Sequence, residues 1–374
     1  MSALYIHIPF CKQACHYCDF HFSTQITQKS EMLRAICMEI ALQKDYLQNK
    51  TLRSVYFGGG TPSLLDEADL EQIFKAIQFH FTLSPQTEIT LEANPDDLNR
   101  KKLQVFQKLG INRLSIGIQS FHEPHLIFLH RSHSAIQAEN CVKLAQDVGF
   151  TNITIDLMYA IPAESHQIWE KDLQKALSLN VPHISAYCLT IEPRTVFGKK
   201  VEKRKMAPID ENFAREQMQI LINMLTQAGF EHYEISNFAQ KGYYSQHNTN
   251  YWLGSEYLGI GASAHSYNGE SRQFNIADNK RYISEILRGK VPATIEKLSP
   301  QDKLNEYLLT SLRTQWGAEK SKILALHPYF FVENQEKLQK FVQMDWLWEN
   351  HEKIGLTTEG KFFADQIAGD LFWV

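Results

Sequence analysis

The sequence predicts an α/β protein: a partial (β/α)6 TIM-like barrel, followed by a small, mainly helical C-terminal domain that resembles a winged helix. Two observations predict this architecture. Short runs rich in β-branched and aromatic residues alternate with amphipathic segments up to about residue 190, and the last eighty or so residues are mainly amphipathic. Six strand–helix units in succession favour parallel strands with right-handed crossovers. A closed barrel needs two further repeats, which are not clear, so we expect an open one.

The six expected strands are short apolar runs bounded by turn residues. They span residues 4–9, 54–57, 88–92, 113–119, 152–159 and 183–190. The helix after the second strand is predicted by Leu70, Ile73, Phe74 and Ile77, which recur at helical spacing. Glycines directly after two other segments mark helix ends. The remaining helices expected in the barrel span residues 28–48, 96–109, 134–148 and 167–179.

Beyond the sixth strand the periodic pattern weakens. We expect a helix within residues 206–229 and another at 279–287, whereas residues 243–268 are rich in glycine and tyrosine and have only weak periodicity. Val291 and Pro292 mark the expected start of the last domain. The chain is therefore divided into a barrel core, an extension and a C-terminal domain, at residues 1–200, 201–292 and 293–374.

The C-terminal domain is expected to contain three helices followed by a short β-wing and a final helix. The segments concerned are residues 302–316, 320–326 and 334–344, then 354–362, with the final helix running to Phe372. A winged-helix shape is typical of DNA-binding proteins. However, the net charge is −4 and no helix is strongly basic, which argues against nucleic acid as a partner.

Composition sets further limits on the function. Hydrophobic residues make up 44% of the chain and charged residues 21%, which is ordinary for a globular protein. The slightly acidic balance gives no electrostatic reason for binding nucleic acid or an anionic membrane surface. No apolar run is long enough to cross a bilayer, and no basic patch followed by an apolar segment indicates secretion. We expect a cytoplasmic protein.

Three of the six cysteines lie within eight residues of one another, in a CxxxCxxC pattern directly after the first strand: Cys11, Cys15 and Cys18. Clustered thiolates select iron–sulfur clusters or zinc. Structural zinc usually has four protein ligands, and no second cysteine pair is present. Three histidines are close enough in sequence to complete a Cys3His zinc site: His7, His16 and His21. Otherwise, three cysteines would hold three irons of a [4Fe–4S] cluster and leave the fourth open to another ligand.

Polar residues and glycines follow several expected strands, at the edge where the loops of a parallel barrel collect. Gly58, Gly59 and Gly60 follow the second strand, where glycine permits either close approach of a ligand or a tight turn. Three other strands carry Glu92, Gln119 and Asp156, and Arg131 lies in the loop after the fourth strand. Such residues can also serve only to satisfy loop backbone. Their convergence on one rim favours a binding site.

Five ordered motifs carry a resemblance to a known family: residues 5–20, 58–62, 91–95, 115–121 and 154–162. They are similar to those of radical S-adenosylmethionine enzymes, in the subgroup of the oxygen-independent coproporphyrinogen III dehydrogenase and the heme chaperones related to it. The resemblance implies that the three cysteines bind a [4Fe–4S] cluster and that S-adenosylmethionine binds the open iron. Electron transfer from the cluster can then cleave the sulfonium to a 5′-deoxyadenosyl radical.

The resemblance also assigns residues by their position in the motifs. Tyr5 and Tyr17 would flank the cluster and cofactor. Four residues would contact S-adenosylmethionine: Gly59, Gly60, Thr61 and Glu92. Three more match positions that bind a second S-adenosylmethionine in the dehydrogenase: Gln119, Arg131 and Asp156. These roles suit the chemistry, because carboxylates accept hydrogen bonds from amino or hydroxyl groups and arginine can bind a carboxylate.

Two features distinguish the relatives. The dehydrogenase has a further cysteine in the pattern CxxxCxxCxC, whereas this chain has Phe20 there, as the chaperone branch does. Residues 247–252 read HNTNYW, similar to a hexapeptide associated with heme binding in that branch. His247 would be an axial ligand of heme iron, and Tyr251 and Trp252 offer flat apolar surface to a porphyrin.

The resemblance thus implies a heme chaperone that binds heme and passes it to an acceptor protein, with a membrane-associated acceptor among the candidates. No residue is assigned a catalytic role on this hypothesis. Two alternatives stay open at this point. One is radical decarboxylation of coproporphyrinogen III, and the other is a zinc-stapled binding module without redox function.

Overall fold

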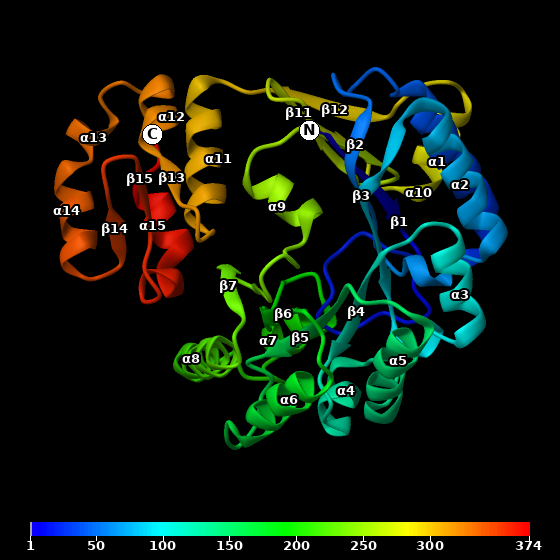
Figure 1. Ribbon diagram of the computed structural model, residues 1–374, viewed down its shortest axis with the longest axis horizontal. Coiled ribbons are helices and arrows are strands. Elements are labelled where there is room, and N and C mark those ends of the chain that lie inside the picture. Colours follow the sequence, from blue (N-terminus) through cyan, green and yellow to red (C-terminus); the bar gives the residue numbers. More distant parts are fainter. Residues whose placement is uncertain (1) are drawn as a thin grey trace.

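A twelve-stranded sheet forms the centre of the molecule in the computed structural model, which describes residues 2–374 (Figure 1). Its middle consists of six parallel strands that neighbour one another in sequence order. These strands are β1 (Ser2–Ile8), β2 (Thr51–Gly59), β3 (Thr82–Ala93), β4 (Arg113–Gln119), β5 (Ile153–Tyr159) and β6 (His183–Cys188). All six predicted strands are present, and the open (β/α)6 arrangement is confirmed.

Helices connect these strands and bury their apolar stripes against the sheet. α2 shows the local cause: Asp66 and Asp69 form a reciprocal capping box at its start, and the four residues predicted to face the core are buried. α3 begins four residues later than predicted, because the segment from Pro95 to Asp97 forms a 3-10 turn. The connecting helices are α1 (Lys29–Leu42), α2 (Glu67–His80), α3 (Arg100–Lys108), α4 (Glu123–Leu129), α5 (Ala135–Val148) and α6 (Gln167–Ser178).

Antiparallel and edge strands that the sequence did not reveal extend the sheet on both sides. Next to β6 lie β8 (Asn237–Ala239) and β7 (Glu231–Glu234). Next to β1 lies β9 (Tyr257–Ile260), which is parallel to it, followed by β10 (His265–Tyr267), β11 (Ser271–Asn275) and β12 (Ala293–Lys297). The helices of this region are α7 (Val196–Glu202), α8 (Glu211–Gln227), α9 (Gln246–Trp252) and α10 (Asn279–Leu287).

Helix α9 packs at the amino-terminal end of the barrel, opposite the rim where the βα loops lie. The buried carboxylate of Glu88 on β3 accepts hydrogen bonds from the backbone N–H groups of Gln246 and His247, at 3.1 and 3.0 Å. A carboxylate at a helix start satisfies N–H groups that have no partner within the helix. Glu88 also lies 3.9 Å from the buried guanidinium of Arg113. Polar groups therefore fix α9 in the barrel.

The C-terminal part has its own apolar core, formed by residues from Leu304 to Leu371 (Figure 1). Its elements are α11 (Pro300–Leu312), β13 (Ala318–Glu319), α12 (Lys320–Leu326), α13 (Phe330–Glu333), α14 (Gln335–Gln343), β14 (Leu347–Glu349), β15 (Lys353–Leu356) and α15 (Ala364–Asp370). The wing is the β14–β15 hairpin, so its prediction at residues 354–362 was placed too late in the chain. The domain boundary after residue 292 stays a prediction, and β12 still pairs with β11 of the large sheet.

Candidate functional site

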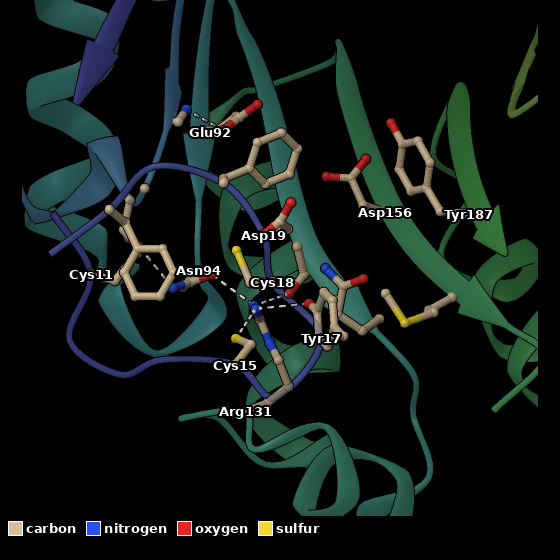
Figure 2. Close-up of a pocket in the computed structure, with 18 of the residues that line it drawn as sticks. Cys11, Cys15, Tyr17, Cys18, Asp19, Glu92, Asn94, Arg131, Asp156 and Tyr187 are labelled. Carbon is tan, nitrogen blue, oxygen red and sulfur yellow. Dashed lines mark hydrogen bonds between the residues drawn. The ribbon is translucent and has the colours of Figure 1, made fainter. Parts of the chain in front are cut away.

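A cavity of about 720 Å³ opens at the carboxyl ends of the parallel strands, under the cysteine loop (Figure 2). Eleven of the residues that the sequence singled out line it: Cys11, Cys15, Tyr17, Cys18, Gly59, Gly60, Thr61, Glu92, Gln119, Arg131 and Asp156. Tyr5 and His247 are not among the lining residues. The structure thus brings together side chains that are up to 145 residues apart in the sequence, counted from Cys11 to Asp156.

Backbone hydrogen bonds shape the cysteine loop. The N–H of Cys11 donates to the carbonyl of Ser23 at 3.0 Å, which closes the loop at its base. The N–H of His16 donates to the carbonyl of Leu129 at 3.1 Å and ties the loop to the end of α4. Two side chains reach the sulfurs: Thr61 Oγ1 lies 3.4 Å from Cys11 Sγ, and Arg131 Nη1 lies 3.2 Å from Cys15 Sγ. The loop is therefore held in a defined shape above the cavity.

The three cysteine thiols are not arranged around a single point in this structure. Across residues 2–374, no three His, Cys, Asp or Glu side chains come close enough together to hold one ion. Zinc needs its thiolates within about 2.3 Å, whereas each cysteine of a four-iron cluster binds a separate iron. Burial raises the pKa of Cys11 and of Cys18 to about 11, so these groups are thiols until a metal displaces the proton.

Arg131 connects the cysteine loop to strands β3 and β4. Its half-buried guanidinium lies beside Cys15 and Tyr17, and its Nη2 donates to Asn94 Oδ1 at 2.7 Å and to the Gly117 carbonyl at 2.8 Å (Figure 2). Five fixed donors in one plane make arginine suited to such a bridge. Arg131 therefore places positive charge next to the sulfur-bearing loop.

Glu92 provides the carboxylate on the β3 side of the cavity. It accepts hydrogen bonds from the Tyr56 hydroxyl at 2.7 Å and from the Gly59 N–H at 3.2 Å. Burial raises the pKa of Glu92 to about 7, and the nearby carboxyl of Asp156 acts in the same direction. Glu92 is therefore poised to change charge near neutral pH, and a bound cation would favour its charged form.

The glycine turn after β2 is required by close packing. A Cβ on Gly60 would lie 2.6 Å from the carbonyl oxygen of Phe10 and 2.8 Å from that of Ile8. The Gly60 N–H donates to the Ile8 carbonyl at 2.9 Å. Gly59 has a φ of +105°, a conformation that favours glycine. Gly59 and Gly60 thus let the turn approach the start of the cysteine loop, while both still line the cavity.

The far side of the cavity is built by β4, β5 and β6. Asp156 accepts a hydrogen bond from Ser115 Oγ at 3.1 Å, and burial raises the pKa of Asp156 to about 6. Gln119 ends β4 with a φ of 67°, beside an irregularity in the β4–β5 pairing. A positive φ is uncommon for a residue with a side chain and is often found at binding sites. Tyr187 on β6 lies beside Asp156 of the neighbouring strand β5 (Figure 2).

Sequence reasoning missed several residues that line this cavity: Asp19, Asn94, Ser115 and Tyr187. The motifs that carry the family resemblance are a signal that could have found two of them. Asn94 lies two residues after Glu92, and Ser115 lies four before Gln119. Both belong to motifs that had been recognised.

Tyr5 and His247 lie deeper in the barrel. The Tyr5 hydroxyl and His7 Nδ1 are 3.0 Å apart, and the Tyr5 ring stacks on that of Tyr56 at 6.2 Å. His247 is fully buried, with Nδ1 2.9 Å from Ser54 Oγ and Nε2 3.0 Å from the Tyr251 hydroxyl. Burial lowers the pKa of His247 to about 3, so its imidazole is neutral. Both of its ring nitrogens are engaged within the protein.

The parallel barrel, the cysteine loop and the cavity beneath it define a class, and comparison with known proteins identifies it. A family model described as the radical SAM superfamily matches residues 5–176. A protein from Bacillus subtilis named heme chaperone HemW is 32% identical over 99% of this chain and 98% of its own length. A protein of that name from Escherichia coli is 30% identical over 98% of this chain and 96% of its own. The chain therefore belongs to the radical SAM superfamily, in the group of the HemW relatives.

A solved structure gives the same result for the fold. Coproporphyrinogen III oxidase (HemN) from Escherichia coli, a radical SAM enzyme, superposes with a TM-score of 0.85 over 99% of this chain and 90% of its own. The two sequences are 22% identical, so the likeness concerns the fold. Among the described residues, 2–374, none of the helices combines the length and apolarity that a membrane span requires.

Proposed function

We propose that the protein is a heme chaperone that carries a [4Fe–4S] cluster with exchangeable S-adenosylmethionine, and that it binds heme and transfers it to an acceptor protein. The observation that carries the proposal is Phe20, which occupies the position of the additional cysteine in the dehydrogenase pattern. Phe20 lies at the cavity mouth and is 73% exposed. The names of the full-length relatives support the same function.

On this proposal Cys11, Cys15 and Cys18 bind three irons of the cluster. The cluster supplies the electron that could cleave bound S-adenosylmethionine. The protein itself would position S-adenosylmethionine. The Glu92 carboxylate would accept a hydrogen bond from its amino group, and Thr61 would contact the cofactor beside Cys11. Gly59 and Gly60 leave room at the same edge, because no side chain intervenes.

Gln119, Arg131 and Asp156 would bind a second S-adenosylmethionine or the far part of the first. Asp156 has the free acceptor capacity for this role, since Ser115 is its hydrogen-bond donor and Asp156 still lines the cavity. Arg131 is already bound to Asn94 and the Gly117 carbonyl. We therefore assign Arg131 to orientation and Asp156 to direct contact.

His247 is proposed as an axial ligand of heme iron. Iron ligation through Nε2 requires that the hydrogen bond with Tyr251 be given up and that the ring become accessible from outside the barrel. The heme-bound form would thus differ from this structure around α9. A Tyr251→Phe variant keeps the ring and removes the hydroxyl that competes for Nε2, so it should bind heme at least as tightly as wild type.

The test is anaerobic reconstitution followed by titration with heme and measurement of the Soret band. We expect stoichiometric heme in wild type, an altered Soret band in His247→Ala, and wild-type behaviour in His351→Ala, an exposed histidine of the β14–β15 turn. Metal analysis belongs to the same preparation. If the analysis finds zinc without acid-labile sulfide, the site is a Cys3His zinc site and not an iron–sulfur cluster, and the proposal is refuted.

The alternative function is radical decarboxylation of coproporphyrinogen III to protoporphyrinogen IX. It is favoured by one observation, that the cavity continues past Glu92 to Asp156 and Tyr187, which leaves space for a substrate near the cofactor positions. Incubation of the reconstituted protein with reductant, S-adenosylmethionine and coproporphyrinogen III separates the two functions. Formation of protoporphyrinogen would overturn the chaperone proposal.

A further inference from the structure

A second, smaller cavity of about 200 Å³ lies between the end of α9 and the C-terminal part of the chain. Trp252 and Leu253 contribute to it from α9 and the residue that follows. The other walls come from α11, the turn after it, β13, α12 and β15. Ligand pockets of whole small molecules are typically about 300–1,000 Å³. This cavity is therefore suited to one edge or one side chain of a larger ligand.

Two of the residues that line this cavity, Trp252 and Lys353, carry hydrogen-bond donors that have no side-chain or backbone acceptor among residues 2–374. Trp252 Nε1 is buried and has no acceptor within residues 2–374. Lys353 lines the cavity, and its ammonium takes part in none of the ion pairs of the described chain. Lys322 adds a second ammonium, which lies 3.2 Å from the carboxylate of Glu319, a residue that also lines the cavity. A buried N–H group without an acceptor is destabilising, so an acceptor such as a carboxylate oxygen would be favoured beside Trp252.

The remaining walls are flat and aromatic. Tyr307 and Trp316 line the cavity together with Trp252. The guanidinium of Arg313 lies 5.3 Å from the centre of the Trp252 rings and is itself held by Glu234 at 3.3 Å and Asp365 at 3.0 Å. Trp252 is therefore fixed in place from one side. A site with aromatic walls and cationic donors is complementary to a carboxylate carried on a planar ring.

This cavity is on a different side of α9 from His247. Trp252 follows His247 by five positions, so the two side chains point in directions that differ by about 140° around the helix axis. His247 faces the barrel interior, where Ser54 and Tyr56 contact it, whereas Trp252 faces the C-terminal part. The two ends of the HNTNYW hexapeptide thus present different chemistry, and the Trp252 end borders this cavity.

We propose that this cavity binds a carboxylate side chain of a tetrapyrrole, with Trp252 Nε1 and the Lys353 ammonium as the donors and Lys322 as a supporting cation. The inference rests on the proposed heme-binding function and deepens it, because it names the part of the ligand that is recognised and the residues that recognise it. The tetrapyrrole ring itself would lie outside the cavity, and ligation of its iron by His247 would require the rearrangement around α9 that the proposed function already requires.

The experiment compares heme with its dimethyl ester, which has the same ring and iron but no free carboxylate. Dissociation constants for both are measured with the full-length reconstituted protein in wild type, Lys353→Gln and Trp252→Phe. Lys340→Gln on α14 is the matched control, since it removes an exposed lysine away from the cavity. Circular dichroism and thermal unfolding of each variant confirm that it folds.

We expect wild type to prefer heme over the ester by about tenfold or more, the range for a hydrogen bond to a charged group. Lys353→Gln should weaken heme binding by a similar factor without affecting the ester, and Trp252→Phe should do the same to a smaller extent. Wild-type heme binding in both variants, or equal weakening of both ligands, would overturn the carboxylate site. Absence of heme binding by wild type would instead refute the proposed function from which this inference starts.

Discussion

The two ends of the barrel interior are both polar, but they are organised differently. At the rim, Glu92 and Asp156 have partners on one side and face a cavity on the other. At the amino-terminal end, Glu88, Arg113 and His247 are more completely buried than these two carboxylates and contact one another or helix α9. Burial and a shifted pKa occur at both ends, so neither property alone identifies a binding site. What distinguishes the rim from the amino-terminal end is that its polar groups have unused hydrogen-bonding capacity facing a cavity.

The largest effect is expected at the rim, where a change in the cysteine loop should remove the bound metal. Cys15→Ser is expected to remove nearly all bound iron and acid-labile sulfide after anaerobic reconstitution, because three thiolates are the minimum set for a four-iron cluster. Cys37→Ser is the control, since Cys37 lies on α1, away from the cavity. Iron and sulfide are measured in both variants against wild type. Full iron content in Cys15→Ser would show that the loop is not the metal centre.

The amino-terminal end should respond in stability instead. Glu88→Gln removes the charge that pairs with buried Arg113 and weakens the cap on α9, and breaking a buried pair of this kind costs about 3–5 kcal/mol. Glu71→Gln breaks an exposed pair with Lys75 and should cost less than about 1 kcal/mol. Urea unfolding of the metal-free protein measures both. Equal effects would mean that the buried network does not fix α9.

A third change acts on the contact between the glycine turn and the cysteine loop. Gly60→Ala places a methyl group against the backbone of Ile8 and Phe10 and should destabilise the protein by about 1–3 kcal/mol. The displaced loop should also hold less iron after reconstitution. Gly369→Ala in α15 is the control, because nothing lies within 4 Å of its added carbon and alanine favours a helix. If Gly60→Ala is as stable as wild type, close packing is not what requires glycine at this position, and its role would be limited to ligand binding.

The sequence was most informative where one physical signal dominated. Strand β4 has the predicted bounds, and the four predicted core positions of α2 are buried, because burial on one face imposes a regular apolar pattern. Strands β9 to β12 were missed for the opposite reason. They are three to five residues long and largely paired at the edge of the sheet, so little apolar periodicity is required of them.

Prediction of the candidate site from the sequence was also limited to what local motifs reveal. Motif recognition placed Cys11, Glu92 and Asp156 around one cavity, but the hexapeptide at residues 247–252 gave no information on which side chain faces which part of the protein. That depends on how α9 is docked, and docking depends on Glu88, which is about 160 residues away in the sequence. Contacts of this range cannot be obtained from local spacing.

The smallest expected effect concerns the charge of Glu92. Its pKa is raised to about 7, so the carboxylate forms as pH rises through neutrality, and binding of S-adenosylmethionine through its amino group should strengthen over the same interval. The Tyr56 hydroxyl donates to Glu92 and favours the charged form. Tyr56→Phe should therefore move the midpoint of binding to higher pH by about one unit, as expected for loss of a hydrogen bond to a charged group.

Calorimetric titration of the reconstituted protein with S-adenosylmethionine across the neutral range measures this midpoint. Glu92→Gln should abolish the pH dependence that belongs to this carboxyl, and Tyr267→Phe, which removes a hydroxyl on β10, should leave the midpoint unchanged. If Tyr56→Phe binds with the wild-type midpoint, the Tyr56–Glu92 contact does not control the charge at the rim. The rim would then resemble the amino-terminal end, where buried polar groups serve the fold and not a ligand.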